Sequence, residues 1–183
     1  MTEEFKNEQI KSAMKLNDIN FKGYWREDEE YIDLPSFVDW WFIEELVRNL
    51  DAAVPRSDYM YKDQLGKLFA GPVWDFDYST FIPYGNFVCK NAIYYNRLFS
   101  DPVFVSLVKD RWALLKTKFE TVPDYIRIVA DRMLIPNTIN ISIWPINSNT
   151  NGDESMSYSD AIDRMVNNYI DRLNWLDFQI NHM

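Results

Sequence analysis

The chain has 183 residues, of which 47% are apolar and 16% aromatic, and its formal net charge is -9 at pH 7. This length and apolar content are typical of one folded domain, or the larger part of one, and exclude a disordered chain. The excess of acids disfavours binding to nucleic acids or to anionic lipid surfaces. No run of about 18 uncharged apolar residues occurs, so the sequence predicts no transmembrane segment.

The residues that most often carry nucleophilic or zinc chemistry are scarce. Cys89 is the single cysteine and His182 the single histidine, which excludes an internal disulfide and disfavours histidine-dependent triads and cysteine-rich metal clusters. Cys89 stands beside Lys90, a cation that favours the thiolate form. A buried, unreactive cysteine is nevertheless a simpler interpretation than an activated thiol. The N-terminus shows no basic stretch followed by an apolar one, so no secretion signal is readable in this sequence.

The first thirty residues are charged and weakly patterned. A short helix is expected within 2-TEEFKNEQIKSAMKL-16, and an acidic cluster follows at 27-EDEE-30. Apolar residues do not recur at a regular spacing in this segment, so we expect it to bury little surface. We therefore interpret residues 1–30 as a linker or boundary segment and residues 31–183 as the folded unit.

A long, mostly buried helix is predicted within 33-DLPSFVDWWFIEELVRNL-50. Asp33 or Ser36 can cap its N-terminus, and Pro35 suits a first helical turn. Aromatic and aliphatic residues then recur at helical spacing on more than one face. The helix is expected to end near Asn49.

A β-hairpin is predicted after this helix. Two short β-prone pieces, 59–62 and 67–69, are joined by 63-DQLG-66, where Gly66 is free to adopt a positive φ. The second strand leads directly into 74-WDFD-77. The region 79–99 is then expected to be a loop that closes with a short helix in 94–99.

Helices are predicted for most of the remaining chain. Asp101 caps the first of them and Pro102 takes its first position. Its inward stripe is expected to contain Phe104, Leu107, Val108, Trp112, Leu115 and Phe119.

Two further helices are expected toward the C-terminus. One begins at 121-TVPD-124, where Thr121 and Asp124 resemble a capping box. Between residues 135 and 157 the chain is expected to be a polar, Asn-rich loop, and a last helix runs from about Ser159 to Ile180. The inward residues are predicted to be Ile126, Val129, Ala130 and Met133 on the first helix, and Ile162, Met165, Tyr169, Leu173 and Leu176 on the second. The predicted fold is therefore mainly α with a small β-hairpin, an α+β class.

Asp75 and Asp77 are the most unusual polar residues, because they stand between aromatic neighbours in 71-GPVWDFDYST-80. On one strand, or at its end, side chains two residues apart point to the same side. Two converging carboxylates repel one another unless a cation or an arginine lies between them, and Mg²⁺ prefers such hard oxygen ligands. The two acids also have a purely structural interpretation, in which one caps a turn and the other pairs with an arginine. For a D-x-D pair taken alone, this interpretation is as good as a metal site.

A third acid, Asp51, follows the long helix in 48-RNLD-51, and the hairpin returns the chain to Asp75 after 24 residues. The end of the helix and the end of the hairpin can then face one cleft. This order of parts is found in kinase-like phosphotransferases, where one Asp orients or deprotonates the acceptor and another holds Mg²⁺. The sequence does not decide which of Asp51 and Asp75 would be base and which ligand.

Three strings together, 36-SFVDWWFIEELVRNLDA-52, 58-DYMYKDQLGKLFAGPVWDFDYST-80 and 99-FSDPVFVSLVKDRWALLK-116, resemble the C-terminal part of the spore-coat protein H (CotH) kinase family, and 144-WPI-146 adds to the match. The resemblance covers roughly residues 31 to 176. It implies the C-terminal lobe of an atypical, secreted bacterial kinase that transfers the γ-phosphate of ATP to Ser or Thr of a surface or spore-coat protein.

The resemblance also implies roles for individual residues. Asp51 corresponds to the catalytic acid, Asp75 to a metal-binding acid with Asp77 as its helper, and Lys62 to a nucleotide-side residue. ATP and Mg²⁺ are the implied cofactors, and an extracellular or cell-surface location is implied by the family.

Two features depart from a complete kinase. The loop 51-DAAVPRSDY-59 offers Arg56, Ser57 and Asp58 where a kinase-type loop places an Asn five residues after the acid, and Asp58 is the candidate substitute for that Asn. No glycine-rich phosphate loop or V-A-I-K strand precedes the long helix, so the half that clamps the nucleotide is expected to be missing. An inactive kinase-like module that serves as a surface scaffold therefore stays open.

A carbohydrate-binding aromatic surface is the third alternative. Its candidates are Trp25, Trp40, Trp41, Trp112, Trp144 and Trp175. Most of them fall on helical apolar stripes and are better interpreted as core residues.

Overall fold

The computed structural model describes residues 31–53, 58–77, 79–83, 85–92, 94–147 and 155–183. It confirms a mainly helical α+β fold with one two-stranded antiparallel sheet. The elements are α3 (Leu34–Val47), the 3-10 helix η1 (Leu50–Ala53), β1 (Met60–Lys62), β2 (Leu68–Ala70), α4 (Tyr95–Leu98), α5 (Pro102–Phe119), α6 (Val122–Ile143) and α7 (Tyr158–Asn181). None of the described helices is long and apolar enough to cross a membrane.

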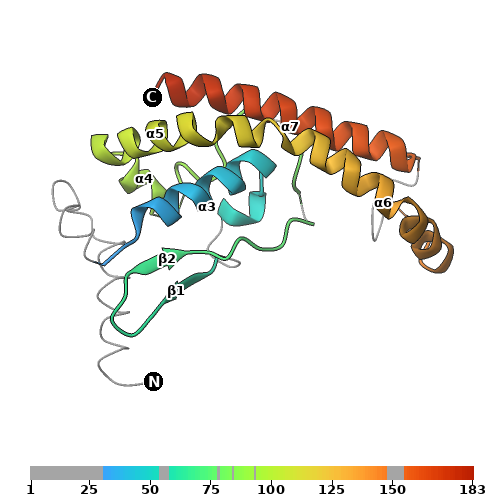
Figure 1. The fold of residues 1–183 in the computed structure, drawn as a ribbon, viewed down its shortest axis with the longest axis horizontal. Coiled ribbons are helices and arrows are strands. Elements are labelled where there is room, and N and C mark those ends of the chain that lie inside the picture. Colours follow the sequence, from blue (N-terminus) through green and yellow to red (C-terminus); the bar gives the residue numbers. More distant parts are fainter. Residues whose placement is uncertain (1–30, 54–57, 78, 84, 93, 148–154) are drawn as a thin grey trace.

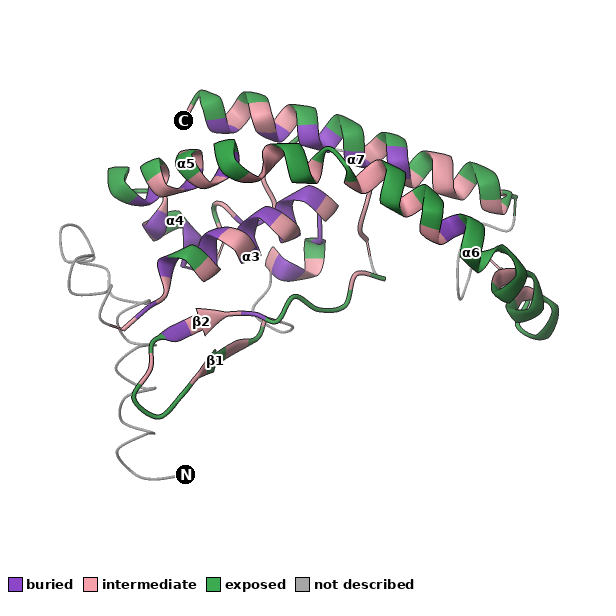
Figure 2. Cartoon of the chain, in the orientation of Figure 1, coloured by how far each residue is buried: buried purple, intermediate pink, exposed green. Residues whose placement is uncertain are grey.

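Helix α3 is the centre of the fold. It lies between a layer formed by α5 and α7 on one side and the β1–β2 hairpin on the other (Figure 1). Buried side chains cover nearly all of its faces (Figure 2), as expected for a helix enclosed by neighbours. Residues buried along it are Leu34, Phe37, Val38, Trp40, Trp41, Phe42, Glu44, Glu45 and Leu46.

The ends of α3 follow the sequence signals. The Asp33 side chain accepts a hydrogen bond from the Ser36 backbone N–H at 2.9 Å, and Pro35 lies in the first turn. At the other end Arg48 adopts the left-handed conformation with φ 54° and closes the last turn. The predicted helix, with its cap and its end close to Asn49, is therefore confirmed.

The hairpin is anchored to the chain that enters α3. The Leu68 N–H donates to the Tyr31 carbonyl at 2.7 Å, the Asp33 N–H donates to the Leu68 carbonyl at 2.9 Å, and the Ala70 N–H reaches Ser36 Oγ. The hairpin is confirmed, but Gly66 does not have the positive φ expected of it. The connection is longer than a two-residue turn, so its geometry does not require that conformation.

Helices α4 and α5 follow their sequence signals as well. Asp101 Oδ1 accepts a hydrogen bond from the Val103 N–H at 2.8 Å and caps α5. Phe104, Val108 and Trp112 are buried on the predicted inward stripe of this helix. Helix α4 forms within the aromatic patch at 94–99.

Helix α6 differs most from its prediction. It continues through Pro136 to Ile143, where a polar loop was expected from residue 135. A single proline removes one helical hydrogen bond without preventing helix on both sides. Met133 is exposed rather than inward, and only Ala130 is buried on this helix.

The expected capping box at the start of α6 is also wrong. The Thr121 hydroxyl donates to the Lys118 carbonyl at 2.8 Å, so it serves the end of α5 and makes no cap bond to α6. The close succession of α5 and α6 explains this, because the Thr121 backbone is already helical. The helix expected in residues 2–16 lies outside the described residues, as does most of the loop at 147–155.

Helix α7 confirms the prediction of a long final helix. Ser157 caps it by accepting a hydrogen bond from the Asp160 N–H at 3.1 Å. Tyr169, Leu173 and Leu176 are buried as predicted, whereas Ile162 and Met165 are only half-buried. Among the predicted core tryptophans, Trp40, Trp41 and Trp112 are buried, Trp175 is half-buried, Trp144 is 67% exposed, and Trp25 lies outside the described residues.

A buried ion pair joins α3 to α7. Arg172 Nη2 lies 2.5 Å from Glu45 Oε2, and both side chains are almost fully buried. The Glu45 carboxylate also accepts the backbone N–H groups of Val88, Cys89 and Lys90 at 2.7 to 3.1 Å. An acceptor-only group surrounded by donors is an ionised carboxylate.

Burial lowers the pKa of Arg172 to about 10, against the opposing charge of Glu45, so the guanidinium stays protonated at neutral pH. Its Nε donates to the Glu45 carbonyl at 2.7 Å and its Nη1 to the Asn86 carbonyl at 3.0 Å. One arginine therefore connects α7, α3 and the loop at 86–90.

Replacing Glu45 by Gln leaves the buried Arg172 cation without its counter-charge. We expect a loss of about 3 to 5 kcal/mol in the free energy of unfolding, measured by urea denaturation at pH 7.5. Asp163→Asn is the matched control, because the Arg127–Asp163 pair is half-exposed on both sides and is worth less than about 1 kcal/mol. Equal losses in the two variants would contradict this assignment.

Candidate active site

Asp75 and Asp77 lie beyond the end of β2, in an exposed loop. The charge of Asp77 acts on Asp75, so the two carboxyl groups lie near one another. The local geometry is a loop and not a strand, because Asp75 has φ 62° and β2 ends at Ala70. Asp tolerates the left-handed region better than most residues.

The loop that follows is held in place by α3 and α7. The Phe81 N–H donates to the Val47 carbonyl at 2.7 Å, and the Asn168 amide donates to the Phe81 carbonyl at 2.5 Å. Within the loop, Thr80 Oγ1 donates to the Phe76 carbonyl at 2.6 Å. Ser79 and Phe81 share with Asp75 a positive φ, and such a concentration of unusual backbone is more frequent at functional sites.

Asp51 lies in η1, immediately after α3. Its backbone N–H donates to Asn49 Oδ1 at 3.1 Å, which fixes the first turn of η1. The Asp51 residue is half-buried. The end of α3 thus determines where this acid stands.

The three acids are close enough to influence one another. The pKa of Asp75 is raised, first by loss of hydration, then by the charge and hydrogen bond of Asp77, and then by the charge of Asp51; a hydrogen bond with Trp74 opposes these effects. Converging negative charges favour a shared proton or a bound cation. The structure therefore brings Asp51, Asp75 and Asp77 near one another, with Asp51 half-buried and the other two exposed.

The comparisons with known proteins give one result. The family model described as CotH kinase protein matches residues 3–176. The chain belongs to the CotH kinase family. Curated proteins and solved structures gave no match.

The donor set of this CotH kinase chain suits Mg²⁺. Within the described residues no group of three or more His, Cys, Asp or Glu side chains is arranged to hold a metal ion by itself. Mg²⁺ usually takes only one or two carboxylates and completes its shell with waters and phosphate oxygens. The Asp75–Asp77 pair, exposed and made of hard oxygen donors, fits that pattern.

Lys62 does not reach the acids. Its ammonium group donates a short hydrogen bond to the Gly66 carbonyl, across the turn of the hairpin. The residue is half-buried at the end of β1. Its role toward a nucleotide stays a prediction.

Cys89 and His182 behave as the composition suggested. Cys89 is fully buried, and burial followed by the charge of Glu45 raises its pKa far above the usual range, so the thiol is not activated. His182 ends α7 and stacks on Phe178 with ring centroids 4.1 Å apart. Neither residue takes part in the acidic site.

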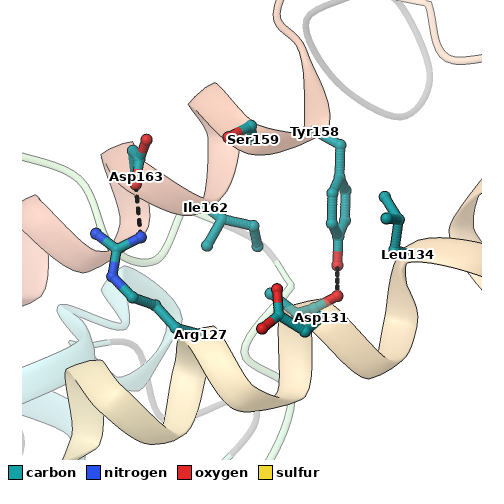
Figure 3. Close-up of a pocket in the computed structure, with 8 residues that line it drawn as sticks. Arg127, Asp131, Leu134, Tyr158, Ser159, Ile162 and Asp163 are labelled. Atoms are coloured by element: carbon teal, nitrogen blue, oxygen red, sulfur yellow. Dashed lines mark hydrogen bonds and ion pairs between the residues drawn. The ribbon is translucent and has the colours of Figure 1, made fainter.

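A separate pocket of about 310 Å³ lies between α6 and α7 (Figure 3). Arg127 of α6 pairs with Asp163 of α7 at 2.7 Å across it, and the Tyr158 hydroxyl donates to the Ala130 carbonyl at 2.9 Å. None of the three candidate acids lines this pocket. It is therefore distinct from the acidic site.

Sequence reasoning missed the buried polar residues behind Asp51. Glu44 is 1% exposed, and its carboxyl accepts a hydrogen bond from the Asn49 side chain. The Oδ1 atom of the same Asn49 accepts the backbone N–H of Asp51. The available signal was Glu44 and Glu45 side by side in a helix that is otherwise apolar at most positions. Two adjacent acids in such a helix need partners inside the fold.

If the acids converge as described, Asp77→Asn will lower the pKa of Asp75, because it removes the negative charge beside it. Asp51→Asn will lower it by a smaller amount. Carbon-detected NMR of the Asp75 carboxyl across pH 2 to 8 measures both shifts, with Asp110→Asn on the exposed surface of α5 as a charge-matched control. An Asp75 pKa that is the same in Asp77→Asn and in the control would contradict the geometry.

Proposed function

We propose that this chain is the C-terminal lobe of a CotH-type atypical kinase that transfers the γ-phosphate of ATP to Ser or Thr of a secreted or cell-surface protein. The observation that carries the proposal is the proximity of Asp75 to Asp77 and Asp51, whose charges both raise its pKa, in a chain of this family. Phosphoryl transfer needs chiefly positioning and charge neutralisation, and carboxylates would contribute to the second by holding Mg²⁺ against the phosphate oxygens.

Each acid has a distinct role in this proposal. Asp75 and Asp77 hold Mg²⁺, which neutralises charge on the phosphate oxygens of ATP when bound. Asp51 accepts the proton of the acceptor hydroxyl as its oxygen bonds to the γ-phosphorus and the bond to the ADP oxygen breaks. Asp51 suits the acceptor side because it is set back at the end of α3, whereas the other two acids share an exposed loop.

A hollow whose lining ends two residues before Asp75 is the place that we propose for the acceptor. A hollow of about 400 Å³ lies between α3 and the hairpin, with Trp40, Tyr61 and Val73 among its lining residues. Val73 stands two residues before Asp75, so an extended segment in this groove leads toward the acids. An acceptor segment with an apolar side chain near its Ser or Thr fits this lining.

The first experiment is calorimetric titration of Mg²⁺ and ATP into the purified chain, at pH 7.5. We expect binding in the wild type and at least a ten-fold weaker affinity in Asp75→Asn, about 1.4 kcal/mol or more. Asn keeps the size of Asp and tolerates the left-handed backbone at this position. Asp110→Asn again controls for the change in net charge.

The outcomes separate the alternatives. Binding that is lost in Asp75→Asn and kept in Asp110→Asn supports a phosphotransfer site and justifies a transfer assay. Equal binding in all three chains would place the nucleotide elsewhere. Absence of binding in the wild type would count against nucleotide binding by this lobe alone and favour a scaffold role.

Lys62 is tested in the same titration. As a nucleotide-side residue it must release the Gly66 carbonyl and turn toward the phosphates. Lys62→Met then weakens ATP binding about three-fold or more, the loss of one exposed charge contact. An unchanged affinity would assign Lys62 to the hairpin turn only.

A further inference from the structure

Helix α6 turns an apolar face away from the rest of the fold. Its side toward α7 is marked by residues that are buried or half-buried, among them Ile126, Ala130, Asn137 and Ile141. The opposite side carries four isoleucines that are 49% to 72% exposed and that we call the outer stripe: Ile128, Ile135, Ile139 and Ile143. The side that packs on the fold therefore includes an asparagine, whereas the exposed side has isoleucine at four positions.

The outer stripe has the spacing of a contact between helices. Its members are separated by seven, four and four residues, so they stay on one face over about four helical turns. A surface helix normally places polar residues on the face that points away from its own core. Because α6 does the reverse, its outward face is suited to packing against another helix.

The outer stripe is accessible in the fold as it stands. The second half of α6 lies at one edge of the molecule (Figure 1). Exposed residues follow one another along most of this helix (Figure 2). A partner can therefore reach the stripe without displacing any other described element.

The distribution of charge favours a second copy of this chain as the partner. The chain has a net charge of -9, yet residues 133–152 contain no charged side chain. Two copies repel one another over most of their surfaces, and the second half of α6 is a place where they can meet without bringing carboxylates together. A basic partner would instead be attracted to acidic surface and would find no counter-charge along these residues.

Arg132 determines the relative direction of the two helices. It lies on the side of the outer stripe, four residues after Ile128 and three before Ile135. Parallel helices in register would set Arg132 against Arg132, and like charges at a seam are unfavourable. An antiparallel pair centred next to Ile135 sets Arg132 opposite Ile139 and Ile128 opposite Ile143. The two arginines are then about 10 Å apart along the helix axis.

We propose that two copies of this chain pair through the outer stripes of their α6 helices, antiparallel and related by a two-fold axis. Such a contact uses the same surface on both copies, so it closes at two and does not extend into a filament. The proposal is independent of the proposed phosphotransfer.

The size of the contact predicts a weak, reversible dimer. It is about 24 Å long and one helix, about 10 Å, wide, which corresponds to the small class of interfaces. Because apolar side chains make the contact and the remaining surfaces repel, salt that screens this repulsion is expected to strengthen the dimer.

The first test is sedimentation equilibrium of the purified chain from about 10 to about 500 µM, the range in which weak dimers form. We expect the mean mass to rise from that of one chain toward that of two as concentration increases. The rise is expected at lower concentration in high salt than in low salt. One mass at all concentrations, equal to that of a single chain, would overturn the proposal.

Two substitutions in α6 locate the contact. Ile139→Glu places a carboxylate on the outer stripe and is expected to weaken the dimer at least ten-fold. Met133→Glu is the matched control, because it adds the same charge to the same helix at a position off the stripe. The two side chains are 56% and 48% exposed, so both variants are expected to fold, as circular dichroism can verify. A dimer that is equally strong in both variants would contradict the assignment to the outer stripe.

Disulfide cross-linking under mild oxidation tests the antiparallel direction. A mixture of Ile128→Cys chains with Ile143→Cys chains is expected to give a covalent dimer, because these two positions lie opposite each other. Ile128→Cys chains alone are expected to stay uncoupled, since their cysteines are about 22 Å apart along the axis. The native Cys89 is buried and does not compete. Efficient coupling of Ile128→Cys with itself would overturn the antiparallel pair.

These measurements need no nucleotide, so their outcome is separate from that of the ATP titration. A dimer that is lost in Ile139→Glu and kept in Met133→Glu supports the proposal even in a chain that does not bind ATP. Nucleotide binding by a chain that stays single at every concentration would support the proposed function and reject the dimer.

Discussion

The arrangement of this fold depends on one buried ion pair, between Glu45 of α3 and Arg172 of α7. The pair is costly to bury, and its desolvation is offset by the hydrogen bonds that both side chains make to backbone groups around them. Arg172 reaches the Asn86 carbonyl, and Glu45 collects three successive backbone N–H groups from the same loop. A loop without regular structure is thereby fixed to two helices, and the core aromatic residues pack around a defined scaffold.

The two adjacent glutamates of α3 have different surroundings because successive helical positions point in different directions. Glu45 meets a cation and a set of backbone donors, and the ion pair serves the architecture. Glu44 has the Asn49 amide beside it, and Asn49 in turn accepts the Asp51 N–H. A single helix turn therefore connects the structural centre of this CotH kinase chain with the acids that we propose for phosphotransfer.

The acidic site is assembled by contacts between segments that are distant in sequence. Asp51 is placed by the end of α3, whereas Asp75 is placed by the hairpin and by a loop that bonds to Val47 and Asn168. Asp75 has a left-handed backbone with φ 62°, and the charge of Asp77 acts on it there. Two acids separated by one residue can lie close together on a regular strand or in a loop. The prediction that they lie close together therefore did not depend on which of the two forms.

The sequence by itself determined the fold class, the caps of α3 and α5, the hairpin and the identity of the candidate acids, since these depend on neighbours within a few residues. The family resemblance supplied the expected chemistry. Only the tertiary structure decided that α6 continues through Pro136, that Met133 faces solvent and that Glu44 is buried. Those outcomes depend on which surfaces other segments cover, and local periodicity carries no information on the partners that a buried polar group finds across the fold.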